Sequence, residues 1–166
     1  TYKPDIDETP LAGETPRDTC LRLAINKCKA VPAESLALVI GADQVLDLDG
    51  EAVSKPGDFA TALAQLTRCQ GKTLTVYSAL ALRNTADEHI QSAVVPTHIR
   101  YRHLPEAELI AYLKHEEPYD CAGSIKSEAS GMALLAAVQS DDPSALIGLP
   151  LIALTDMLRQ QGYRFF

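Results

Sequence analysis

The pattern of apolar positions along the chain centres on residues 36–45, LALVIGADQV, where apolar residues run without a break through Ile40. A short run rich in Val, Ile and Leu is typical of a strand that is buried on both faces. We expect this strand to leave the core near Asp43, and ligands of open α/β sheets bind at such strand ends. Gly41 and Ala42 are small enough for other backbone or a ligand to come close. Asp43 therefore has two candidate roles, a ligand-binding carboxylate or the cap of a turn.

Apolar residues at helical spacing predict four helices. The first begins at Thr15, which can cap it, and ends before Pro32. Lys27 lies near the apolar stripe of this helix. The other three are the segment between Asp58 and Gly71 and the ranges 105–115 and 151–161.

Further strands are predicted by alternating and β-branched segments. Asp49 and Gly50 favour a hairpin turn after the first strand, with a return strand at 52–56. The ranges 73–83 and 89–102 form a second hairpin, interrupted at Pro96. Residues 119–131 form an ordered polar loop, and 132–138 are ambiguous between strand and helix. This order predicts an α/β protein with a central mixed β-sheet flanked by helices.

Length and charge narrow the class of protein. The 166 residues are enough for one domain with a real core. A net charge of −7 argues against a general nucleic-acid-binding surface, and no apolar stretch is long enough to cross a bilayer. The four cysteines form no CxxC pair, which favours reduced thiols in a cytoplasmic protein over disulfides or a zinc site.

Three polar side chains are candidates to work with Asp43: Glu8, Lys27 and Lys55. A carboxylate that holds a divalent cation or orients a water, together with lysines that offset charge, suits phosphate chemistry. The chain has neither a Walker loop nor a GxGxxG motif, so a P-loop or Rossmann site is not indicated. A GxSxG elbow and metal spacing of histidines are also absent from the sequence. The alternative for each residue alone is a solvated surface group.

Several short motifs together resemble the Maf family of nucleotide pyrophosphatases. The motifs occur in the same order as in the family over nearly the whole chain, so the ordered set is far more specific than any single motif. They are Asp7-Glu8-Thr9-Pro10, Arg22-Leu23-Ala24 with Lys27, Gly41-Ala42-Asp43-Gln44-Val45, Ser54-Lys55-Pro56, Asp120-Cys121-Ala122-Gly123-Ser124, Lys126-Ser127-Glu128 and Gly148-Leu149-Pro150-Leu151. The wording around Gln44 and Glu128 resembles the YceF-like subgroup, which is associated with 7-methyl-GTP.

The resemblance implies an ITPase-like α/β fold and hydrolysis between the α- and β-phosphates of a nucleoside triphosphate. It also implies a divalent metal cation (Mg, Mn or Co), a cytoplasmic enzyme and often a homodimer. Asp43 matches the proton acceptor and metal-binding position. Glu8, Lys27 and Lys55 match the substrate pocket.

Gln44 and Glu128 match the positions that tune base choice. N7-methylated guanine is positively charged and offers N–H donors, which a carboxylate can accept. Two alternatives stay open: a pyrophosphatase for dTTP, UTP or other modified nucleotides, and a nucleotide-binding regulator of cell division.

The start of the chain departs from the family pattern. The family begins with a strand and a serine-rich loop that helps to bind phosphates, and residues 1–13 match neither. We therefore expect residues 1–166 to be a single Maf-like domain without its N-terminal strand and phosphate-binding loop.

Overall fold

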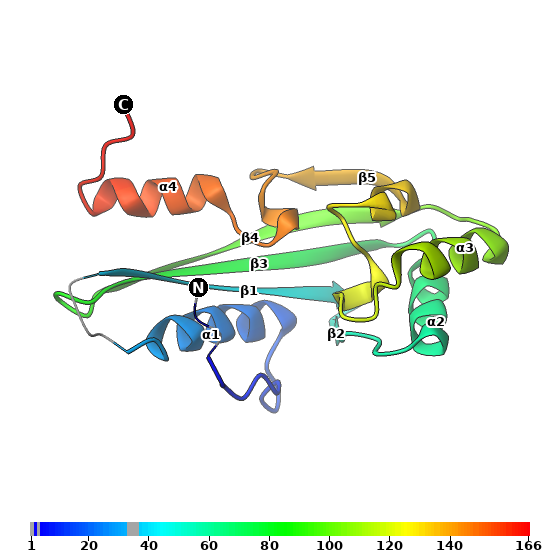
Figure 1. Ribbon diagram of the computed structural model, residues 1–166, viewed down its shortest axis with the longest axis horizontal. Helices are drawn as coiled ribbons and strands as arrows, with labels where there is room; N and C mark the ends of the chain where they lie inside the picture. The colour runs from blue at the N-terminus through cyan, green and yellow to red at the C-terminus, as the bar shows by residue number, and fades with distance from the viewer. Residues whose placement is uncertain (1, 3, 33–36) are drawn as a thin grey trace.

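The computed structural model describes residues 2, 4–32 and 37–166, which form one five-stranded sheet with helices on both sides (Figure 1). The strand order is β2-β1-β3-β4-β5. The strands are β1 (Leu38–Leu48), β2 (Glu51–Val53), β3 (Thr73–Asn84), β4 (Ile90–Tyr101) and β5 (Leu135–Ser140). The helices are α1 (Pro16–Lys29), α2 (Phe59–Cys69), α3 (Glu106–Glu116) and α4 (Leu151–Gln160), with the short 3₁₀ helices η1 (Ala122–Ser124), η2 (Ser130–Leu134) and η3 (Ala145–Ile147).

The predicted α/β class is confirmed, although the sheet is more regular than expected. Every pairing between the described strands is antiparallel, where a mixed sheet was predicted. Parallel neighbours need a crossover that carries the chain back along the strands. Here β1–β2 and β3–β4 are hairpins, and the connections through α2 and α3 stay at one end of the sheet (Figure 1).

Helix α1 covers one face of the sheet and follows its predicted start. The Thr15 side chain accepts a hydrogen bond from the Asp18 amide, and Pro16 occupies the first turn. The small buried residues of this contact form the α1 core: Cys20, Ala24, Cys28, Ala79 and Ala81. A Cβ at Gly41 would clash with the Ala24 carbonyl oxygen, so the backbone that closely approaches this glycine belongs to α1.

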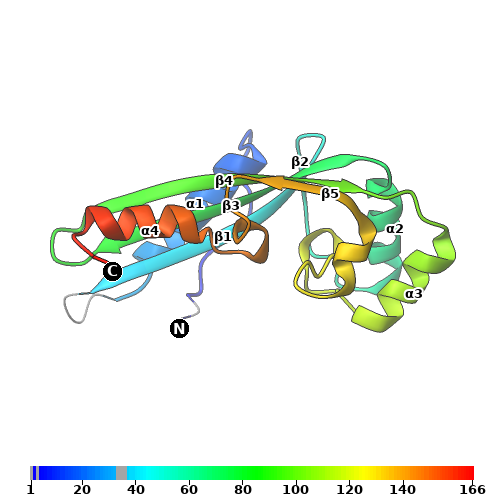
Figure 2. The same cartoon turned by 90° about the horizontal axis from the view of Figure 1, so that it is seen from above.

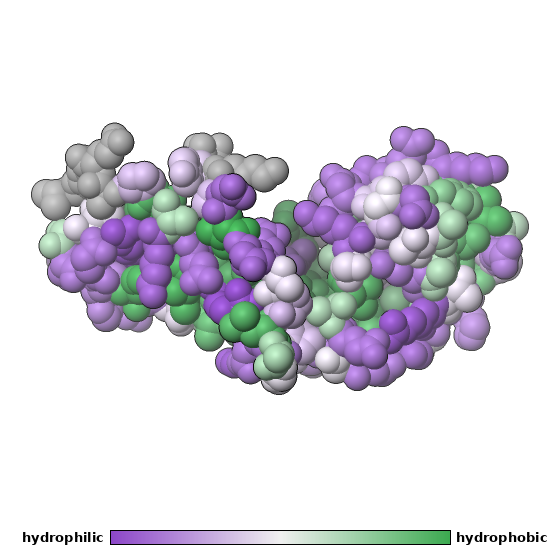
Figure 3. All heavy atoms as spheres, turned by 90° about the horizontal axis from the view of Figure 1, so that it is seen from below, coloured by the Kyte–Doolittle hydropathy of each residue, from purple (hydrophilic) through white to green (hydrophobic). Residues whose placement is uncertain are grey.

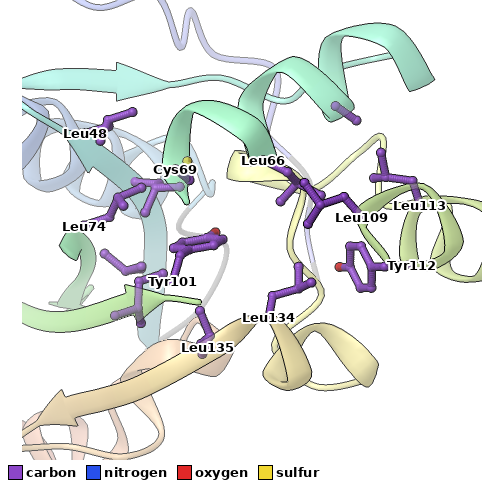
Figure 4. Close-up of a cluster of buried hydrophobic side chains, with 14 of the residues drawn as sticks. Leu48, Leu66, Cys69, Leu74, Tyr101, Leu109, Tyr112, Leu113, Leu134 and Leu135 are labelled. Carbon is purple, nitrogen blue, oxygen red and sulfur yellow. The ribbon is translucent and has the colours of Figure 1, made fainter. Parts of the chain in front are cut away.

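The opposite face of the sheet carries two apolar clusters, one at each end. Helices α2 and α3 and η2 cover the larger cluster, the α2–α3 core, which Figure 4 shows around Tyr101. Helix α4 covers the smaller α4 core, made of Leu80, Leu82, Leu154 and Met157. Figures 1 and 2 show α4 and the α2–α3 pair at opposite ends of the long strands. The space-filling view in Figure 3 shows a hollow at the waist between the two ends.

Two expected strand features are wrong. Strand β1 continues to Leu48, so Asp43 lies inside the strand rather than where it ends, because Leu46 and Leu48 are buried in the α2–α3 core. Pro96 does not interrupt β4; β5 pairs with β4 only from Thr97 to Tyr101, so the missing N–H of Pro96 leaves no strand bond unmade on that side.

Other boundaries differ in smaller ways. The return strand β2 is shorter than the predicted 52–56 and ends at Val53. The ambiguous range 132–138 contains the end of η2 followed by β5. Leu36, the first residue of the predicted strand 36–45, lies outside the described residues.

Candidate active site

A charged cluster of Glu8, Lys27 and Asp43 lies where α1 crosses β1. Because side chains alternate along a strand, Asp43 points to the same face as Gly41 and Val45, the face that α1 covers. The Lys27 ammonium is 2.6 Å from Asp43 Oδ1 and 2.8 Å from Glu8 Oε1. The Asp43 side chain is only 10% exposed, against 55% for Glu8. The ammonium therefore links a nearly buried carboxylate to an exposed one.

The pKa values of Asp43 and Lys27 are both raised, but for different reasons. Burial raises the pKa of Asp43, and the hydrogen bond and charge of Lys27 offset only part of this effect. Burial acts to lower the pKa of Lys27, but its hydrogen bonds to Asp43 and Glu8 together raise it. Lys27 has two carboxylate partners, which together outweigh the effect of its burial on its pKa. Asp43 has only one ammonium partner, and the like charge of Glu8 nearby raises its pKa further. Asp43 is thus a carboxylate of raised basicity.

A second ion pair holds the N-terminal segment that carries Glu8. Arg22 of α1 donates from Nε to Glu14 Oε1 and from Nη2 to Glu14 Oε2, both at 2.7 Å. Arg22 Nη2 also donates to the Thr9 carbonyl at 3.0 Å. The hydrogen bond from Arg22 lowers the pKa of Glu14 to about 2. Through these bonds Arg22 fixes both Thr9 and Glu14, which flank residues 10–13, to helix α1. Thr9 directly follows Glu8, so the position of Glu8 is restrained as well.

Gln44 points to the face opposite Asp43, because the two residues are consecutive in β1. Its Nε2 lies 3.0 Å from Ser78 Oγ and 3.1 Å from the carbonyl oxygens of Ala145 and Leu146. Ser78 Oγ donates to the Ala145 carbonyl at 2.6 Å. We call this group, namely Gln44, Ser78 and the two η3 carbonyls, the amide seam.

Glu128 is exposed, and the preceding residue, Ser127, links it to the amide seam. Ser127 Oγ is 3.3 Å from the Leu146 carbonyl and 3.5 Å from Glu128 Oε2. The preceding residue, Lys126, has a structural role, since its ammonium donates to the Glu116 carbonyl at the end of α3. The loop 119–131 thus presents Glu128 next to the carbonyl that Gln44 also contacts.

The structure therefore divides the predicted site residues between two faces of β1. Glu8, Lys27 and Asp43 are brought together on the α1 face. Gln44 and Glu128 lie on the opposite face, linked through η3. Lys55 is exposed and makes no ion pair within the described part of the chain, but its charge is near enough to lower the pKa of Asp43.

The other chemical alternatives in the sequence receive little support. Ser124 is fully buried and donates to Gln65 Oε1 at 2.8 Å, so it is held as a structural hydroxyl. The four cysteines are free, and three of them are buried. Across residues 2, 4–32 and 37–166, no three His, Cys, Asp or Glu side chains are grouped to hold a metal ion. In the same part of the chain, no helix is long and apolar enough to span a membrane.

Two contributors to the site were missed from the sequence. Ser78 lies on a face of β3 that is otherwise apolar, between Val76 and Leu80, and this lone hydroxyl was a usable signal. The Arg22–Glu14 pair gave a weaker signal, because the two residues are eight apart and Glu14 precedes the helix. None of these three residues was assigned a role in the site from the sequence pattern.

Comparison with known proteins gives a consistent result. The family described as Maf-like protein matches residues 1–161. A protein of Burkholderia orbicola named 7-methyl-GTP pyrophosphatase is 56% identical over 98% of this chain and 80% of its own length. Proteins of the same name from Cupriavidus metallidurans and Thiobacillus denitrificans are 56% and 52% identical, over 98% and 96% of this chain and 82% and 80% of their own lengths.

Proposed function

Because this chain belongs to the Maf family, we propose that it hydrolyses the α,β-phosphoanhydride of 7-methyl-GTP to 7-methyl-GMP and pyrophosphate. The name shared by relatives that are more than half identical over almost the whole chain supports this substrate. We expect the enzyme to work in the cytoplasm, and a homodimer remains a prediction from the family resemblance.

The observation that carries the proposal is the nearly buried Asp43 with its raised pKa, held by Lys27. In the proposed reaction, a water attacks the α-phosphorus and gives its proton to Asp43. The bond from the α-phosphorus to the bridging oxygen breaks, and its electron pair leaves with pyrophosphate. Burial improves Asp43 as a proton acceptor because it raises the basicity of the carboxylate towards working pH.

Lys27 and Lys55 would offset the charge that gathers on phosphate oxygens. Asp43, with Glu8 close by, would hold the divalent cation that the family resemblance implies. One or two carboxylates suit such a cation, because magnesium sites in phosphate enzymes are commonly completed by substrate oxygens and water. When bound, the cation would supply further neutralisation of phosphate charge.

The base would meet Gln44 and Glu128 on the other side of β1. At Asp43 and Gln44, the outer edge of β1 has no strand partner among the described residues, since β2 pairs only with Leu46–Leu48. One nucleotide that passes this edge can therefore contact both side chains. The Glu128 carboxylate can accept from the N–H donors of a cationic methylated guanine.

The test is a panel of nucleoside triphosphates assayed for pyrophosphate release by the full-length protein. The panel contains 7-methyl-GTP, GTP, UTP and dTTP, each with Mg²⁺, Mn²⁺ or Co²⁺ and again after chelation. We expect the highest kcat/KM on 7-methyl-GTP and loss of turnover on chelation. A preference for dTTP or UTP would change the substrate class. Nucleotide binding without pyrophosphate release would favour a regulatory protein.

A further inference from the structure

The amide seam lies between two apolar clusters on one face of the sheet. Along the inward face of β3, Val76 belongs to the α2–α3 core and Leu80 to the α4 core, and Ser78 separates them. Ser78 is fully buried, and a buried hydroxyl is destabilising unless it is paired. Its partners are the Gln44 amide and the Ala145 carbonyl. The seam is therefore a satisfied network in a position where an apolar residue would otherwise be expected.

The acceptors around Gln44 determine which way its amide points. The carbonyl oxygens of Ala145 and Leu146 can only accept hydrogen bonds. The side-chain atom that lies 3.1 Å from both must therefore be the NH₂ group. The opposite orientation would place Oε1 against two carbonyl oxygens, which repel it.

Ser78 completes this arrangement on both of its partners. Its hydrogen goes to the Ala145 carbonyl at 2.6 Å, so a lone pair of Oγ faces Gln44 Nε2 at 3.0 Å. The same hydroxyl thus ties η3 to the sheet and accepts from the amide. Without it, η3 would lose a bond to β3 and the amide would lose one of its three acceptors.

We propose that Ser78 is a positioning residue that fixes the Gln44 amide with its oxygen available to the nucleotide, so that the site selects bases that offer hydrogen-bond donors. This inference rests on the proposed function and deepens it. The nitrogen of Gln44 is fully used within the protein. Its Oε1 receives no hydrogen bond from the described residues, which leaves an acceptor to meet the base.

Two acceptors then face the base from the same side of β1. Ser127 contacts the Leu146 carbonyl, which ties the loop of Glu128 to the carbonyl that Gln44 also contacts. Guanine presents a ring N–H and an amino group next to each other, both of which are donors. Uracil presents carbonyl oxygens on both sides of its ring N–H, so at least one of them would face an acceptor.

The first test compares Ser78→Ala with Thr97→Val in the full-length protein. Thr97 is a fully buried hydroxyl on the same face of β4 that bonds Ser140 and does not contact Gln44, so it is a matched control. For Ser78→Ala, we expect the kcat/KM ratio of 7-methyl-GTP over UTP to fall about three- to tenfold, the scale of one neutral hydrogen bond. The loss should lie in KM for 7-methyl-GTP, with kcat little changed. Thr97→Val should keep the ratio within about twofold.

The second variant, Gln44→Glu, separates positioning from simple charge. A carboxylate cannot donate to the η3 carbonyls, so we expect poorer use of 7-methyl-GTP even though the added charge should attract a cationic base. A gain in kcat/KM would overturn the proposal. An unchanged ratio in a folded Ser78→Ala protein would overturn it as well.

A third measurement does not depend on activity. Gln44 is an exposed residue of β1, so the informative quantity is the difference in amide exchange between two proteins. The ¹⁵N side-chain amide signals of Gln44, assigned by their loss in Gln44→Leu, should exchange with solvent more slowly in the wild type than in Ser78→Ala. Equal exchange rates in the two proteins would overturn the positioning role. In one outcome, the amide exchange of Gln44 is as expected while the wild type releases no pyrophosphate from any nucleotide. In that outcome the proposed function fails, but the positioning of the Gln44 amide by Ser78 stands.

Discussion

The two sides of β1 at Asp43 and Gln44 are built on different physical principles. On the α1 side, Asp43 is held by ionised side chains, and one of them, Glu8, is 55% exposed. On the other side, Gln44 is held by a buried hydroxyl and two backbone carbonyls, all of them neutral. A change of one residue along the strand therefore exchanges direct contacts with charged groups for direct contacts with neutral ones, although the exposed Glu128 carboxylate lies near the second side.

This difference matches what each side would have to do. Charges act over distance and tolerate small movements, which suits phosphates that change charge during reaction. Neutral hydrogen bonds depend on direction, and backbone carbonyls cannot rotate freely, which suits recognition of a base edge. We therefore expect variants on the α1 side to change turnover and its pH dependence, and variants on the amide seam side to change selectivity.

The largest expected effect is that of Asp43→Asn. The amide has nearly the same shape but cannot accept the proton from water, so kcat should fall at least about a hundredfold. Nucleotide binding, measured by calorimetry, should persist. Asp47→Asn is the matched control, because Asp47 lies on the same face of β1 and accepts from the Gly50 amide in the hairpin turn. Near-normal turnover of Asp43→Asn would show that another group takes the proton.

The next effect belongs to the opposite side of β1. Glu128→Gln keeps the shape of the side chain and removes its charge. Losing a charge-assisted hydrogen bond to a cationic base should lower kcat/KM on 7-methyl-GTP by roughly ten- to a hundredfold or more. On UTP, kcat/KM should stay level or rise, and the metal dependence should not change. The measurement is the ratio for the two nucleotides; an unchanged ratio would remove Glu128 from base recognition.

A smaller effect, with a distinctive pH signature, is expected for Lys27→Gln. Without the ammonium, the pKa of Asp43 should rise further above its ordinary value, because burial would then be offset less. Asp43 must be ionised to accept a proton, so the fall in kcat/KM on acidification should move to higher pH. Turnover at neutral pH should drop about tenfold, a modest loss for a charge that supports catalysis.

Lys29→Gln provides the control for this variant. Lys29 lies on the same helix with an exposed side chain, so its pH profile should match the wild type. If Lys27→Gln changed turnover without moving the acid limb, Lys27 would act on the phosphates alone and not through Asp43.

Local signals predicted much of this fold because their causes lie within a few residues. The Thr15 and Asp58 caps and the Asp49–Gly50 turn are examples, and each is present. Long-range packing decided the rest. The extension of β1 past Asp43 depends on burial in the α2–α3 core, and Pro96 is accommodated because β5 begins its pairing just after it.

A site residue could be predicted from the sequence when its own side-chain type indicates its chemistry. It could not be predicted when its role depends on which groups the fold places around it. Lys27 and Asp43 attract attention as charges in an apolar setting, and the structure joins them at 2.6 Å. The partners of Gln44 are backbone carbonyls about a hundred residues away, 101 and 102 positions along the chain. A backbone carbonyl has no sequence signal, so the contribution of Ala145 and Leu146 to the amide seam could be found only from the fold.

The smallest expected effect is on thermal stability. Its dependence on pH should differ between the two sides of β1. The pKa of Glu14 is lowered from 4.5 to about 2, chiefly by its hydrogen bond from Arg22. A depressed pKa means that the pair stabilises the folded state above pH 4.5 and that this contribution is lost as pH falls towards 2. Glu14→Gln should therefore lower Tm at neutral pH, and its gap to the wild type should close across that window.

Ser78→Ala is the comparison for this last prediction, because it removes a neutral hydrogen-bonding group from the amide seam. Its Tm gap to the wild type should stay constant over the same pH range, since none of the groups that it touches titrates there. Thermal unfolding of the three proteins between neutral pH and pH 2 makes both measurements in one series. A Glu14→Gln gap that did not change with pH would mean that the segment carrying Glu8 is held by packing, and the contrast between a charged and a neutral side of β1 would then be confined to Lys27 and Asp43.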